Sequence, residues 1–87
     1  MSLEERIGEG SPLAGRPLRS VTLPEGSIIV TVLRGPELTF ASGSTVLEPG
    51  DVVSALAAPS HGDELRQLMR GAEGAVDPVV ERGGQLL

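Results

Sequence analysis

The sequence has no cysteine, a single aromatic residue, Phe40, and a single histidine, His61. A chain without thiols forms neither a disulfide framework nor a thiolate zinc site, and such a composition is typical of a cytosolic protein. With no second histidine or cysteine to complete a metal site, we interpret His61 as a solvated residue at a helix start. The carboxylates are scattered along the chain, so no calcium or magnesium site is predicted.

Long hydrophobic runs and excess positive charge are also missing. Seven basic and twelve acidic residues give a formal net charge of −5, which disfavours binding to nucleic acid or to an anionic membrane surface. No apolar run approaches the roughly 18–20 residues of a transmembrane helix. The first residues lack the pattern of a signal peptide, and Met1–Leu3 resembles a cloning remnant. We therefore expect a cytoplasmic chain, or the cytosolic domain of an inner-membrane protein.

The 87 residues are enough for one small domain, with a core built from Val, Leu, Ile and Ala. A single core is marginal below about 70–80 residues. Because dimerisation would supply additional burial, we expect a homodimer.

The pattern of β-branched and apolar residues predicts a β-rich domain. The run Ser27–Arg34 is the strongest strand prediction, and its continuous apolar character predicts burial on both faces. Alternation at Glu37–Ala41 predicts a half-buried strand. Further strands are expected at Thr45–Leu47 and Val52–Ala58, with turns that use Gly26, Gly35, Gly50 and Asp51.

Two helices are expected beside these strands. Ser11 followed by Pro12 predicts a short N-terminal helix. The apolar stripe between Ser60 and Gly71, with Ser60 and Asp63 resembling a capping box, predicts a C-terminal helix. Residues 1–11 support no more than a lead-in strand or a linker, and we assign residues 1–9 to a tag or linker lead-in. We expect an α+β domain with a small, mainly antiparallel sheet over residues 10–71, followed by a loosely ordered tail (72–87).

No catalytic constellation is present. The serines have no neighbouring base in a nucleophile motif, and the glycines near residues 8–15 lack the spacing of a dinucleotide fingerprint. Arg34 ends the strongest strand, and two interpretations stay open: a surface ion pair with Glu37 or Glu48, or a contact to an anionic ligand. Asp51 is expected to fix its turn by accepting backbone N–H bonds. Arg16 and Arg19 are expected to face solvent.

Several short motifs in order then resemble a known family. Gly15–Arg19, Leu23–Gly26, Ile28–Arg34 and Thr45–Asp51 are similar to the C-terminal domain of potassium-conductance regulators, the RCK-C or TrkA-C domain. The residues at Phe40–Gly43 depart from the family pattern, which has a proline before the glycine. The resemblance implies a homodimeric, cytosolic regulatory domain of a potassium channel or transporter regulator, or of a cation/proton antiporter. It also implies a cyclic dinucleotide or cation ligand near the dimer interface.

We therefore expect a non-enzymatic, ligand-sensing and dimerisation domain of a potassium or other cation transport protein, whose partner is the membrane transport subunit or domain of the parent protein. Arg34 is the candidate ligand-binding residue. A purely structural dimerisation module without a ligand is the alternative. A small β-barrel enzyme or sugar-binding domain is disfavoured by the lack of histidines and aromatics.

Overall fold

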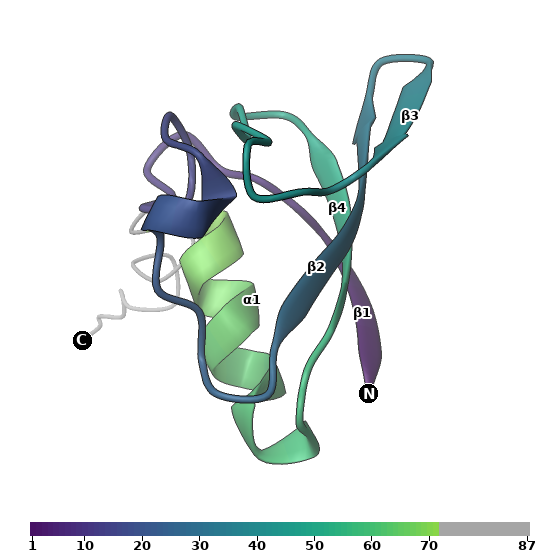
Figure 1. Ribbon diagram of the computed structural model, residues 1–87. Coiled ribbons are helices and arrows are strands. Elements are labelled where there is room, and N and C mark those ends of the chain that lie inside the picture. The colour runs from purple at the N-terminus through teal and green to yellow at the C-terminus, as the bar shows by residue number, and fades with distance from the viewer. Residues whose placement is uncertain (72–87) are drawn as a thin grey trace, which may run out of the picture.

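The computed structural model describes residues 1–71 and shows a four-stranded antiparallel sheet with helices on one face (Figure 1). Its strands are β1 (Ser2–Arg6), β2 (Ile28–Arg34), β3 (Glu37–Phe40) and β4 (Val52–Leu56), in the order β1-β4-β2-β3. The helical elements are the 3-10 turns η1 (Leu18–Ser20) and η2 (Pro59–His61) and the helix α1 (Gly62–Arg70). The α+β fold with a small antiparallel sheet and a C-terminal helix is thus confirmed. The predicted tail (72–87) lies outside the described residues.

The core lies between α1 and the sheet face that is turned toward it. Leu65 and Met69 of the helix are fully buried and pack with Val53 and Ala55 of β4. The spacing of Leu65 and Met69 places both on one face of the helix. The remaining buried apolar residues come from β1, β2 and the connecting segments: Leu3, Ile7, Leu13, Ile29, Val32, Leu47 and Ala57.

The opposite sheet face is open. Strand pairing sets Leu33 opposite Leu38 and Ile28 opposite Leu56, which places each pair on the same side of the sheet. We call this surface the outer face and define it by Ile28, Leu33, Leu38, Phe40 and Leu56, whose exposed fractions range from 37% for Leu33 to 80% for Phe40.

The burial predicted for both faces of β2 is therefore wrong for this chain by itself. Ile29 and Val32 are buried, whereas Ile28 is 58% exposed. The prediction of a half-buried strand at Glu37–Ala41 also overestimates its burial, because all four residues of β3 are exposed. The β2–β3 hairpin extends past the helical layer (Figure 1), and among residues 1–71 nothing covers its outward-facing Leu33, Leu38 and Phe40. An apolar run predicts burial but does not show which molecule provides it.

The first residues form the strand that was one alternative for this segment, and this strand is part of the sheet, so the tag or linker assignment of residues 1–9 is wrong. Ser2–Arg6 pairs with β4 from Leu56 to Val52, and the buried residues Leu3 and Ile7 flank the half-buried Glu5 on the core side. Arg66 and Arg70 of α1 contact the Glu5 carboxylate at 3.6 and 2.9 Å. The alternation of inward-facing and outward-facing residues in this strand is not visible in the sequence, because one inward-facing position is the charged Glu5. Arginines of α1, rather than solvent, neutralise its charge.

The predicted helix at Ser11 is absent, because Gly15 and Pro17 interrupt it and the helical turn forms later, at Leu18–Ser20. Ser11 still caps locally: its Oγ accepts the Leu13 N–H at 3.2 Å and donates to the Leu68 carbonyl at 2.6 Å. The strand predicted at Thr45–Leu47 is reduced to isolated bridges, Val46 with Pro17 and Leu47 with Ala14.

The C-terminal helix is confirmed with a later start than predicted. The residues from Pro59 to His61 form the 3-10 turn η2, and α1 begins at Gly62 without a side-chain cap. Ser60 therefore does not form the predicted capping box.

Candidate functional site

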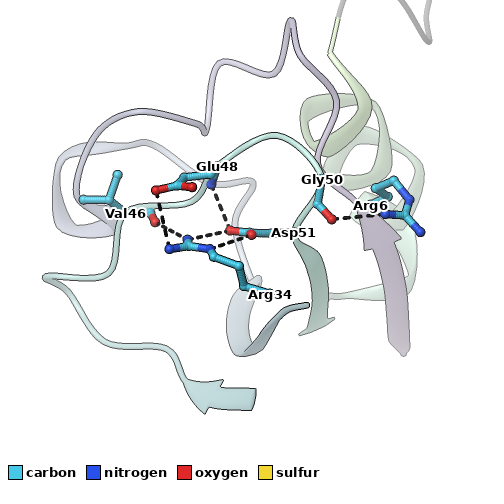
Figure 2. A network of polar contacts seen from close by, with 6 residues as sticks. All are labelled: Arg6, Arg34, Val46, Glu48, Gly50 and Asp51. Carbon is cyan, nitrogen blue, oxygen red and sulfur yellow. Dashed lines mark hydrogen bonds and ion pairs between the residues drawn. The ribbon is translucent and has the colours of Figure 1, made fainter. Parts of the chain in front are cut away.

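Arg34 and Asp51, singled out separately in the sequence, meet in one polar network (Figure 2). Arg34 donates from Nε to Asp51 Oδ1 and from Nη2 to Asp51 Oδ2, both at 2.8 Å. Nη2 also donates to the Val46 carbonyl at 3.0 Å, and Nη1 lies 3.4 Å from Glu48 Oε2. The guanidinium thus makes a bidentate contact with the carboxylate, which is the strongest geometry for this pair of groups. The guanidinium is therefore held by residues of its own chain.

The network is half buried and electrostatically coupled. Asp51 is 2% exposed, whereas the Arg34 side chain is 47% exposed. The hydrogen bonds from Arg34 lower the pKa of the Asp51 carboxyl below its ordinary value, although burial opposes this shift. The same contact with Asp51 raises the pKa of Arg34. With Asp51 and Glu48 both beside Arg34, the local charge does not favour an added anion, and the geometry fits the ion-pair interpretation of Arg34.

Asp51 also organises the turn that precedes β4. Its Oδ2 accepts the Glu48 N–H at 2.9 Å, which is the backbone contact expected of it. Gly50 has φ of +95°, a conformation that glycine adopts readily and β-branched residues avoid. Gly26 and Gly35, the other two turn glycines named from the sequence, also have positive φ. Arg6 Nη1 donates to the Gly50 carbonyl at 3.1 Å, which ties the turn to β1 (Figure 2).

A hollow that the sequence did not reveal lies beside the start of β2. We call it the edge cleft; its volume is about 260 Å³, and it is lined by Leu18, Arg19, Leu23, Ser27, Ile28, Ile29, Ala41, Ser42 and Gly43. Most of its lining is apolar. Two polar groups stand out: the exposed Arg19, and Ser27, whose buried Oγ has no hydrogen-bond partner. A buried hydroxyl without a partner is costly, but this one is covered from solvent and is not itself open to a ligand in the cleft.

Three chain segments far apart in the sequence build the edge cleft. The Leu18 N–H donates to the Thr45 carbonyl at 2.8 Å, and the Arg19 N–H donates to the Gly43 carbonyl at 2.9 Å. Arg19 was expected to face solvent, and its side chain is indeed exposed, but at the rim of this hollow. Ser27, next to a turn glycine, carried no sequence signal. Only the backbone pairing of residues 14–19 with 43–47 places these side chains together.

The other candidate groups do not assemble a reactive centre among residues 1–71. His61 lies at the N-terminus of α1, and its ring Nδ1 lies 3.2 Å from the Glu64 carboxylate. The same residues contain no cluster of three metal-ligating side chains. No helix in the described part of the chain has the length and apolarity needed to cross a bilayer.

Comparison with known proteins identifies the family of the chain as the TrkA-C domain, which its curated relatives carry within potassium transport proteins. Residues 3–70 match the model of the TrkA-C domain, and the chain belongs to this family. It is 31% identical over 67 residues to the Trk system potassium uptake protein TrkA of Mycobacterium tuberculosis, matching 77% of this chain and 30% of that protein. It is 34% identical over 67 residues to the K(+)/H(+) antiporter NhaP2 of a Shewanella species, matching 77% of this chain and 12% of the antiporter.

A solved structure described as an RCK domain with cda has a similar fold. It superposes with a TM-score of 0.66 at 26% identity, covering 78% of this chain and 96% of that chain. The resemblance to the RCK-C and TrkA-C domain inferred from the short motifs is therefore confirmed. The chain spans less than a third of the TrkA and antiporter sequences that it matches.

Proposed function

We propose that this chain is a non-catalytic, ligand-sensing and dimerisation domain of a potassium or other cation transport protein. It would work in the cytoplasm, attached to a membrane transport subunit or to the transport domain of its parent protein. The single observation that carries the proposal is the edge cleft in a TrkA-C domain: a mostly apolar hollow with the exposed Arg19 guanidinium at its rim.

The chemistry of the edge cleft suits a nucleotide better than a metal ion. Leu18, Leu23 and Ile28 offer an apolar wall for a base, and Arg19 offers a guanidinium for a phosphate. No carboxylate lines the cleft, so a bare cation would find no charged oxygen ligands there. The solved relative described as an RCK domain with cda supports a cyclic dinucleotide as the ligand class.

The outer face supports the second half of the proposal. Monomeric proteins rarely leave large apolar patches uncovered, and this chain exposes Leu38, Phe40 and Ile28 by more than half on one side of its sheet. A second copy of the chain is the occupant that the TrkA-C resemblance implies. Ile28 belongs to both the outer face and the edge cleft, so ligand and partner would meet at neighbouring surfaces. A purely structural dimerisation module is the alternative, and it would use the outer face alone.

Titration calorimetry with cyclic di-AMP tests the ligand half of the proposal. We expect binding to the wild-type chain and a rise in melting temperature, because ligand at 100 times its Kd stabilises a fold by about 2.7 kcal/mol. Arg19→Ala should weaken binding by about 10- to 150-fold, the range expected when a charge-assisted hydrogen bond is lost. Ser27→Ala should weaken it less.

Arg16→Ala is the matched control, since this exposed arginine lies three positions away and does not line the cleft. Its affinity should equal that of the wild type. A dimeric wild-type chain that binds neither cyclic di-AMP nor other nucleotides would favour the structural module.

A further inference from the structure

We propose that the Arg34–Asp51 pair is a positioning device for the edge cleft: it holds in place the segment that forms one cleft wall, without touching the ligand. The inference rests on the proposed function for the identity of the ligand. It changes the role of Arg34 from a ligand contact to a residue that acts through the backbone of residues 43–47.

The first step is that Arg34 and Asp51 are both anchored in the sheet. Arg34 is the last residue of β2, and Asp51 immediately precedes β4. The Asp51 carbonyl accepts the Ile7 N–H at 2.8 Å, which fixes this residue to the buried segment after β1. The two side chains therefore join at a rigid part of the fold.

The second step is that the pair reaches from this anchor to the neighbouring segment. Arg34 Nη2 donates to the Val46 carbonyl at 3.0 Å, and Asp51 Oδ2 accepts the Glu48 N–H at 2.9 Å (Figure 2). The pair thus holds main-chain groups on both sides of Leu47, whose side chain is fully buried. A carbonyl held by a cation that is itself held by a carboxylate has little freedom to move.

The third step connects this segment to the cleft. The carbonyls of Leu47, Thr45 and Gly43 accept the N–H groups of Gly15, Leu18 and Arg19 at 2.9, 2.8 and 2.9 Å. This ladder sets the position of the cleft residues Leu18 and Arg19 and joins Arg19 directly to the cleft residue Gly43. A shift of residues 43–47 would therefore move these cleft residues.

The fourth step is that a direct ligand contact by Arg34 is disfavoured. Arg34 does not line the edge cleft; it lines a separate hollow of about 180 Å³ with Glu37, Thr39 and Val46. Its guanidinium already faces the carboxylates of Asp51 and Glu48. An influence of Arg34 on ligand binding would have to pass through Val46 and the ladder.

Arg34→Lys and Asp51→Asn test the proposal, with Arg70→Lys as the matched control. Arg70 has nearly the same side-chain exposure as Arg34, 49% against 47%, and makes a comparable two-pronged contact, with Glu5. It lies on α1 and does not line the cleft. All three variants lose a guanidinium–carboxylate contact of the same kind.

Hydrogen exchange of the Leu18 and Arg19 amides is the first measurement, and it needs no ligand. After correction for global stability, these amides should exchange faster in Arg34→Lys and Asp51→Asn than in the wild type. Their exchange rate in Arg70→Lys should equal that of the wild type. Equal protection in all four proteins would overturn the proposal.

Calorimetry with cyclic di-AMP is the second measurement. Arg34→Lys and Asp51→Asn should each weaken binding by at least about fivefold, and the double variant should be no weaker than the worse single variant. Arg70→Lys should bind like the wild type. Unchanged affinity in Arg34→Lys, with a wild type that binds, would overturn the positioning role. A wild type that does not bind would instead refute the proposed ligand, and the exchange measurement would then decide the positioning role alone.

Discussion

Asp51 shows at the residue scale how one buried charge can carry a pH dependence. The hydrogen bonds from Arg34 lower the pKa of its carboxyl below the ordinary value of 3.8. A lowered folded-state pKa means that the unfolded chain binds the proton more tightly. The stabilisation is therefore fully present above the unfolded-state pKa and is lost as the pH falls through the folded-state pKa.

We predict that Asp51→Asn removes this acid-dependent contribution. Asn keeps the size of the side chain but loses the charge, so the variant should be clearly less stable than the wild type at neutral pH. The difference in the free energy of unfolding should shrink as the pH falls below the ordinary carboxyl value of 3.8, because the unfolded wild-type chain then takes up a proton that the folded carboxylate accepts only at lower pH. Urea unfolding of both proteins across this range measures the difference. A gap that stays constant with pH would contradict the lowered pKa.

The residue scale also shows what the sequence could and could not reveal about the site. Arg34 and Asp51 were visible because each occupies a distinctive place, one at the end of an apolar run and the other in a Pro-Gly turn. The contact between them could not be predicted from the sequence, because the two residues are 17 positions apart and strand pairing decides which acidic residue the arginine contacts. Ser27 lacked any local pattern, since its interest comes only from an unpaired buried hydroxyl.

At the scale of elements, β1 is where sequence and structure differ most. The helix α1 and the strand β2 were predictable because each has a strong period or composition of its own. Strand β1 has a single apolar residue, Leu3, among polar and charged ones, and its fit depends on β4 and on two arginines of α1. Elements stabilised by tertiary contacts carry weak local signals.

Leu3→Ala and Glu4→Ala form a matched test of β1. Leu3 is 6% exposed and belongs to the core, whereas its neighbour Glu4 is exposed on the other side of the strand. We expect Leu3→Ala to lower the free energy of unfolding by roughly 2–5 kcal/mol. Glu4→Ala should change it by no more than about 0.5 kcal/mol. Chemical denaturation measures both changes. A Leu3→Ala protein as stable as the wild type would show that residues 1–9 do not contribute to the stability of the core.

At the scale of the whole molecule, residues 1–71 contain more apolar surface than they cover among themselves. The helices occupy one face of the sheet, and β3 stands at its edge with all four residues exposed. The sequence predicted burial on both faces of β2, and residues 1–71 cover only one of these faces. A second copy of the chain seated on the outer face would reconcile the two.

Leu38→Glu and Thr39→Glu test this arrangement by placing the same charge on opposite sides of one strand. Leu38 lies on the outer face opposite Leu33, whereas Thr39 pairs with the buried Val32 position and points to the other side. Both residues are exposed in the single chain, so neither substitution should unfold it. A carboxylate at the centre of an apolar interface would be desolvated without a partner, which opposes association strongly. Sedimentation at micromolar concentration should therefore show a dimer for the wild type and Thr39→Glu and a monomer for Leu38→Glu. A wild type that sediments only as a monomer would refute the homodimer. A Leu38→Glu variant that is still dimeric would show that the interface lies outside the outer face.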